Sequence, residues 1–129
     1  MEEDRTIAKT TYRIQISTRS MRGAGTDADV RITLEGACGR SSNRILLDTY
    51  GDNFERGDCD SFTITMPGEM GDLCRLKVRH DDSGAGSGWF LDSIKVRNLD
   101  NNQVWLFNCN DWLATDEGDC CIYRTLTAE

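Results

Sequence analysis

The alternation of apolar and polar residues in short runs is the feature that most restricts the fold of this chain. In Tyr12–Ile16 and in Val30–Leu34 every second residue is apolar, which is the period of a strand with one buried face. No window repeats apolar residues at the three- and four-residue spacing of an amphipathic helix. The sequence therefore predicts an all-β protein.

Clusters of Gly, Asn, Asp or Pro, which break strands, separate eight runs of this kind. The inward residues are large enough to fill the interior, so a two-sheet antiparallel sandwich is favoured over a ligand-holding barrel. Cys74, Leu76 and Val78 are predicted to face inward on the fifth run, and residues 112–114 are compatible with a single helical turn. The runs lie near residues 12–16, 30–34, 44–47, 61–66, 73–79, 89–97, 103–107 and 120–126.

Length and charge restrict the class of protein. With 129 residues the chain fits one domain, and we expect a tail at 1–10 and a domain at 11–127. Twenty-two acidic residues against 15 Lys and Arg give a net charge of −7, which makes nucleic acid a poor partner. We expect no targeting or membrane-inserted segment, because no stretch approaches the roughly 20 apolar residues of a membrane span. The six cysteines are expected to be mostly reduced and packed.

Acidic residues concentrate in the connections between runs, notably at Gly23–Asp27, Asp52–Gly57 and His80–Gly84. If successive strands alternate in direction, the connections after the odd-numbered strands share one end of the sandwich. Asp and Asn also favour turns for backbone reasons alone. Crowded carboxylates repel, however, and calcium prefers hard oxygen ligands on tight turns. Twelve acidic residues would then lie at this end, against four at the other: Asp27, Asp48, Asp52, Glu55, Asp58, Asp60, Asp81, Asp82, Asp111, Asp116, Glu117 and Asp119, against Glu35, Glu69, Asp72 and Asp100.

At these residues the chain resembles the PLAT domain, named for polycystin, lipoxygenase and alpha-toxin. The resemblance runs from Tyr12 to about Leu126 and implies a sandwich of two four-stranded antiparallel sheets. It also implies a role in bringing proteins to membranes or to protein partners, often with calcium. The matching segments occur in the family's order: Tyr12–Ile16, GAGTDADV from Gly23, FERG from Phe54, DSF from Asp60, GDL from Gly71, HDDSG from His80, GWFLD from Gly88 and FNCNDWL from Phe107.

The resemblance implies two calcium sites. Where lipoxygenases commonly read Asn-Asp-Phe-Glu, this chain reads Asp52-Asn53-Phe54-Glu55, which keeps the charge but exchanges two positions. The first site would use Gly25, Thr26 and Asp27, completed by Asp81 and Asp82, and the second would use Asp48, Gly51, Asp52, Asn53 and Glu55.

The calcium loops lack the exposed aromatic wedges of lipoxygenase domains. The corresponding stretches are Ser20–Gly23 and Ser83–Ser87, in which Met21 is the only sizeable apolar tip. Burying one such side chain supplies about 1.5–3 kcal/mol, which is too little for stable anchoring. Arg19 and Arg22, or calcium bridging to anionic headgroups, would have to add to it, so Arg19, Met21 and Arg22 are the predicted lipid-binding residues.

The chain offers no convincing nucleophile, base and orienting group, so we predict no enzyme. His80 is interpreted as a strand-end residue, the three tryptophans as core residues and Phe54 as a plug beneath its loop. The leading hypothesis is a calcium-binding module that docks its parent protein on anionic membranes, peripherally and on the cytoplasmic side. The alternative is a protein-interaction or structural repeat domain whose acidic end binds a basic partner without metal, which the missing aromatic wedges favour.

Overall fold

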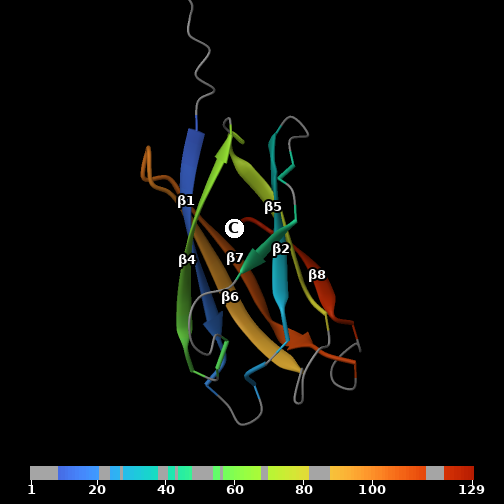
Figure 1. The fold of residues 1–129 in the computed structure, drawn as a ribbon. Helices are drawn as coiled ribbons and strands as arrows, with labels where there is room; N and C mark the ends of the chain where they lie inside the picture. Colours follow the sequence, from blue (N-terminus) through green and yellow to red (C-terminus); the bar gives the residue numbers. More distant parts are fainter. Residues whose placement is uncertain are drawn as a thin grey trace, which may run out of the picture.

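The protein is an eight-stranded antiparallel sandwich, as predicted, in the part of the chain that the computed structural model describes (Figure 1). The described residues are 9–20, 24–26, 28–37, 41–42, 44–47, 54–55, 57–67, 70–81, 88–115 and 121–129. The strands are β1 (Lys9–Thr18), β2 (Val30–Gly36), β3 (Ile45–Leu47), β4 (Cys59–Pro67), β5 (Leu73–His80), β6 (Trp89–Asn98), β7 (Val104–Leu113) and β8 (Tyr123–Thr127).

The strands form two four-stranded sheets, in the orders β4-β1-β6-β7 and β3-β2-β5-β8. Every neighbouring pair is antiparallel. β1 therefore begins, and β8 ends, at the end of the sandwich opposite the connections that follow odd-numbered strands. Within the described ranges, no helix has the length and apolar character needed to cross a bilayer.

The core lies between the two sheets and consists of the inward residues of the alternating runs. Tyr12, Ile14 and Ile16 of β1 are fully buried, and Leu34 and Leu76 face them from the second sheet with no exposed surface. Each side chain of this kind contributes about 1.5–3 kcal/mol when it is removed from water. The apolar residues that alternate in the sequence are therefore the residues that form the core.

The helical turn considered for residues 112–114 is not present at 112–113. Residues 112–113 belong to β7 and not to a helical turn, because Trp112 and Leu113 pair with Phe90 and Trp89 of β6. The ring of Trp112 packs edge-on against Phe90, with 5.3 Å between centroids, which holds the strand in place. β1 begins at Lys9, inside the stretch expected as a tail, while residues 1–8 lie outside the described part of the chain.

A bulge explains why Cys74 is exposed although it was predicted to face inward. Pairing of β2 with β5 shifts between Glu35 and Gly36, so that Gly36 lies opposite Leu73 and Cys74 has no partner across the ladder. The extra residue reverses the alternation, and Leu73 is buried in its place. Cys59 is also exposed, and both residues are free thiols, so the expectation of packed cysteines fails for these two.

Candidate metal centre

The loops that precede and follow the strands at one end of the sandwich are joined by backbone hydrogen bonds. Thr26 N–H donates to the Phe54 carbonyl at 3.0 Å, which ties the first predicted calcium loop to the second. Phe90 N–H donates to the Ala24 carbonyl at 2.9 Å, and Gly57 N–H donates to the Thr18 carbonyl at 3.2 Å. Segments about thirty and sixty residues apart in the sequence therefore meet at the lower end of the molecule in Figure 1.

Asp81 joins this end through a reciprocal pair of hydrogen bonds. Its backbone N–H donates to the Asp29 carbonyl at 3.1 Å, and its carboxylate Oδ1 accepts from the Asp29 N–H, also at 3.1 Å. The side chains of both residues are exposed. Asp81, the first residue after β5, thus lies directly beside the residues that lead into β2, as the alternation of strand directions requires.

The second loop is anchored by Phe54 and by Asp60. The Phe54 ring is buried and stacks on Phe62 with centroids 5.7 Å apart, so it plugs the end of the core as predicted. Its backbone has a positive φ of 61°, which a bulky residue rarely adopts. The Asp60 carboxylate stabilises this turn, because its Oδ2 accepts the Phe54 N–H at 2.8 Å.

Asp60 is the residue at this end whose ionisation the structure perturbs most clearly. Partial burial raises the pKa of its carboxyl above the ordinary value of 3.8, and the negative charge of Asp58 raises it further. The hydrogen bond from Phe54 opposes the shift. A negative charge here is therefore costly in the absence of a nearby cation.

A second acidic residue at this end is already neutralised. Asp111 Oδ2 lies 3.0 Å from an Arg124 guanidinium nitrogen, and the same guanidinium group donates to the Trp112 carbonyl at 3.1 Å. His80 is buried, and its Nε2 lies 2.7 Å from the Leu113 carbonyl oxygen, which fits the predicted strand-end position. Trp89 and Trp105 are core residues, as predicted, while Trp112 is half-buried.

The described part of the chain contains only some of the predicted ligands. Gly25 is half-buried, Thr26 is buried, and Glu55 and Asp81 are exposed, all at the same end. Among the described residues, no three His, Cys, Asp or Glu side chains are grouped closely enough to hold a metal ion. The donor types that do meet here, carboxylates and loop carbonyls, are those that calcium prefers. The remaining predicted ligands lie outside the described residues: Asp27, Asp48, Gly51, Asp52, Asn53 and Asp82.

Of the predicted lipid-binding residues, only Arg19 is described; Met21 and Arg22 are not. The Arg19 guanidinium lies 5.0 Å from the centroid of the Phe90 ring and donates to the Asn110 side-chain oxygen. From the sequence alone, Asp29 had no predicted role, and Asp60 was predicted only as one of the acidic residues at this end. The signal for Asp60 is its place two residues before the inward Phe62, which brings a carboxylate toward the core side of the strand.

The fold and its clustered loops define a class: a two-layer antiparallel sandwich that presents acidic loops at one end. The family profile described as "PLAT/LH2 domain" matches residues 12–127, and the chain belongs to this family.

Curated relatives and a solved structure agree with this assignment. Lipoxygenase homology domain-containing protein 1 of Mus musculus is 40% identical over 115 residues, which cover 89% of this chain and 6% of that protein. Polycystin-1-like protein 3 of Homo sapiens is 41% identical over 113 residues, which cover 88% and 6%. Coral 8R-lipoxygenase, whose structure is described as showing calcium activation via a C2-like domain, matches with a TM-score of 0.78 at 23% identity, covering 92% of this chain and 17% of that one. This chain thus spans a small fraction of its relatives.

Proposed function

We propose that this PLAT domain is a non-catalytic module that binds calcium at its acidic end and thereby docks its parent protein on anionic phospholipid membranes. The observation that carries the proposal is the joining of three acidic connections at one end, through the Thr26–Phe54 and Asp29–Asp81 hydrogen bonds. Calcium would be held by the carboxylates and carbonyls of these connections and would supply positive charge between them and lipid phosphates.

The chain's own residues have three roles in this mechanism. Asp81 is positioned by its bonds to Asp29, so its carboxylate is placed at the rim of the acidic end. The turn at Phe54 fixes the backbone beside Glu55, because its ring is packed in the core. Asp60 keeps that turn in place. A preformed rim of this kind lowers the ordering cost of binding a cation.

Coral 8R-lipoxygenase supports the proposal by analogy, since its structure is described as showing calcium activation via a C2-like domain. The proposed location is peripheral, on the cytoplasmic side of a membrane. Anionic lipids are concentrated in that leaflet, and the exposed free thiols of Cys59 and Cys74 suit a reducing compartment.

Isothermal titration tests the calcium step. Calcium should bind the wild-type chain, and Asp27→Ala or Asp52→Ala should weaken binding by about tenfold or more, because each removes a charged ligand. Asp72→Asn is the matched control, because Asp72 is an exposed acidic residue at the opposite end, bonded to Gln103. Calcium affinity that ignores both loop substitutions would reject the site.

Vesicle cosedimentation tests the membrane step. Binding to phosphatidylserine vesicles should require calcium and should be lost on chelation, because without the cation the acidic end has nothing to bridge it to the headgroup phosphates. Binding that is equal in chelator and in calcium would contradict the mechanism.

The second candidate, a protein-interaction domain, is favoured by the absence of aromatic wedges in residues 20–23 and 83–87. In this case the acidic end would bind a basic partner directly. A pull-down with the chain in chelator separates the two functions, because metal-free partner binding survives chelation and calcium would weaken it by neutralising the acidic end.

A further inference from the structure

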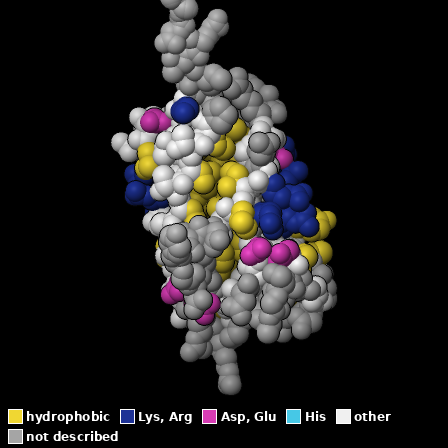
Figure 2. Space-filling view, viewed as in Figure 1, with side chains coloured by type: hydrophobic (Ala, Val, Ile, Leu, Met, Phe, Trp, Pro, Cys, Tyr) yellow, Lys and Arg dark blue, Asp and Glu magenta, His cyan; other side chains and the backbone are white. Residues whose placement is uncertain are grey.

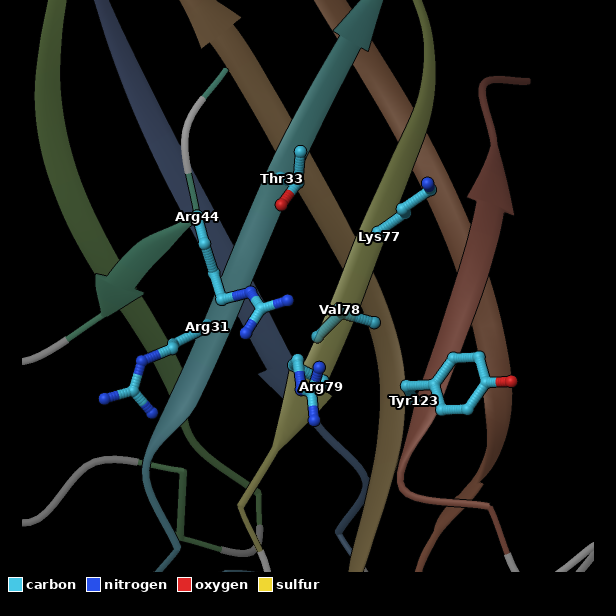
Figure 3. A pocket seen from close by; sticks show the side chains of 7 residues that line it. All are labelled: Arg31, Thr33, Arg44, Lys77, Val78, Arg79 and Tyr123. Carbon is cyan, nitrogen blue, oxygen red and sulfur yellow. The ribbon is translucent and has the colours of Figure 1, made fainter. Parts of the chain in front are cut away.

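A second charged surface lies on the outer face of the sheet β3-β2-β5-β8. Figure 2 shows Lys and Arg side chains gathered on this side of the molecule, above a group of acidic side chains. Arg31, Arg44, Lys77 and Arg79 line a pocket of about 100 Å³ there, together with Thr33, Val78 and Tyr123 (Figure 3). We call these seven residues the basic pocket.

Strand register places like charges directly opposite each other in the basic pocket. Arg31 of β2 pairs with Arg79 of β5, an arrangement that destabilises a sheet when no anion lies between the charges. In Figure 3 the Arg44 side chain reaches over β2 toward Arg79, while Arg31 points toward the β3 side. Arg44 and Arg79 are exposed and Arg31 is half-buried. Exposed side chains of this length reorient in picoseconds to nanoseconds, so the orientations in Figure 3 leave the guanidinium groups able to turn toward a bound anion.

The cations at the other end of β5 are matched by a carboxylate. Glu35 accepts from Arg75 at 2.9 Å and from Lys77 at 3.1 Å, and these bonds lower the pKa of Glu35. Arg31, Arg44 and Arg79 have no such ion pair within the described residues. In a chain with seven more acidic than basic residues, three unmatched arginines around one pocket are a charge arrangement that suits an external anion.

From this arrangement, we propose that the basic pocket binds a phosphate monoester group carried by a membrane lipid, independently of calcium. Arginine pairs with phosphate oxygens in bidentate geometry, and a phosphate monoester carries nearly two negative charges where a carboxylate carries one. The pocket measures about 100 Å³ and is open to solvent, so a phosphate group can enter it from the surface of the sheet.

The residues beside the arginines favour a lipid as the source of the phosphate. Leu46 pairs with Arg31, and Tyr123 pairs with Arg79, so the register builds one row across the sheet: Leu46, Arg31, Arg79, Tyr123. Leu46 is 45% exposed and Tyr123 is 62% exposed. Tyrosine is enriched at membrane–water interfaces, and an exposed leucine beside it offers an apolar contact for a lipid chain. The row is two residues from Asp29 and Asp81, about 7 Å along the strands from the acidic end. The lipid source rests on the proposed membrane function, whereas the phosphate site does not.

Cosedimentation in chelator tests the proposal with two kinds of vesicle: phosphatidylcholine with a phosphatidylinositol monophosphate, and phosphatidylcholine with phosphatidylserine at equal surface charge. We expect the wild-type chain to prefer the first kind, and Arg31→Gln/Arg79→Gln to weaken that binding by about tenfold or more. The matched control is Arg13→Gln/Arg97→Gln, which removes another directly opposed arginine pair on the other sheet, flanked by Thr63 and Val104. The control should change binding less than about twofold.

Equal binding to both vesicles, or equal loss in both double variants, would overturn the proposal, because bulk charge would then explain the result. Binding of inorganic phosphate that depends on Arg31 and Arg79, without binding to either vesicle, would overturn the lipid source and indicate a phosphorylated protein segment. Thermal unfolding checks that the variant is folded. The melting temperature of Arg31→Gln/Arg79→Gln should be no lower than that of wild type, because the substitutions remove repulsion between the two arginines. Asp27→Ala should leave binding in chelator intact, which separates this site from the calcium site.

Discussion

Asp60 shows how one side chain connects the fold to the charge of the acidic end. Its carboxylate accepts the Phe54 N–H and holds a turn with positive φ, which favours keeping an acceptor at this position. Its negative charge is disfavoured by partial burial and by Asp58, which together raise its pKa. The acceptor is therefore useful to the fold, while the charge is a cost that a cation would offset.

Substitutions of Asp60 should separate these two effects. Asp60→Asn keeps an acceptor and removes the charge, so in chelator at neutral pH it should raise the free energy of unfolding, by less than about 1 kcal/mol given solvent screening. Asp60→Ala removes the acceptor and should lower it by about 1–2 kcal/mol. Urea denaturation of both variants and of wild type measures the difference.

The advantage of Asp60→Asn should also depend on pH. The folded state holds the Asp60 proton more tightly than the unfolded state, so wild-type stability from this group falls as pH rises from 3.8 through the raised folded pKa. The gain from the substitution should therefore be largest at neutral pH and disappear toward pH 3.8. A gain that grows on acidification would show that the sign of the pKa shift is wrong.

At the scale of the strands, bulges determine which side chains face the core. The bulge beside Gly36 exposes Cys74, and a register shift between Leu91 and Ser93 explains why the apolar residues of β6 alternate irregularly. Gly36 is tightly enclosed, because a Cβ atom at this position would collide with the Met70 carbonyl oxygen. The segment before β5 thus packs directly on the end of β2.

Gly36→Ala should therefore destabilise the sandwich. Because the contact is with backbone, which cannot move aside as a flexible side chain can, we expect a loss of about 1–3 kcal/mol in the free energy of unfolding. Gly71→Asn is a suitable control, because this glycine has φ of 68°, which Asn tolerates, and nothing lies within 4 Å of the added Cβ. If urea denaturation gives similar midpoints for Gly36→Ala and wild type, the Met70 carbonyl does not lie as close to Gly36 as the structure shows.

The strands could be predicted from sequence because each apolar alternation records one buried face. The register of the strands could not be predicted, because a bulge adds one residue without a signal in the composition. Leu73 and Cys74 are adjacent residues that could each face the core, and the sequence does not show which of them does. Trp112 was misassigned for a related reason, since its strand conformation depends on pairing with Phe90, a residue distant in sequence. Local propensity cannot report such a partner.

Across the described part of the molecule, the acidic end and the basic pocket are two separate charged surfaces. The end that carries Glu55, Asp58 and Asp81 is acidic, while the outer face of β2 and β5 carries Arg31 and Arg79. The meeting of the connections at Thr26, Phe54 and Asp81 could be predicted because antiparallel strands alternate in direction. The basic pocket could not, because it depends on which strands of the sheet are neighbours, and β2 pairs with β5 rather than with β4.

The gathering of exposed acidic residues at one end predicts how salt and calcium affect stability. In chelator, added sodium chloride should raise the melting temperature, because screening reduces repulsion at the acidic end. Calcium at a hundred times its Kd should raise the free energy of unfolding by about 2.7 kcal/mol and should weaken the salt dependence, since the repulsion is then already neutralised. Differential scanning calorimetry with magnesium as the control measures both effects. If calcium leaves the salt dependence of the melting temperature unchanged, the repulsion does not come from the acidic end.

The direction of the first and last strands has a consequence for any longer polypeptide that contains this domain. Lys9 begins β1 at the pole away from the acidic loops, and β8 runs from the acidic end toward that pole. Sequence that precedes β1 or follows β8 would therefore lead away from the acidic loops. Modules joined to the domain at either end would begin on the side away from the acidic loops. The domain could therefore be added between neighbouring modules while its acidic end stays open to a membrane or a partner.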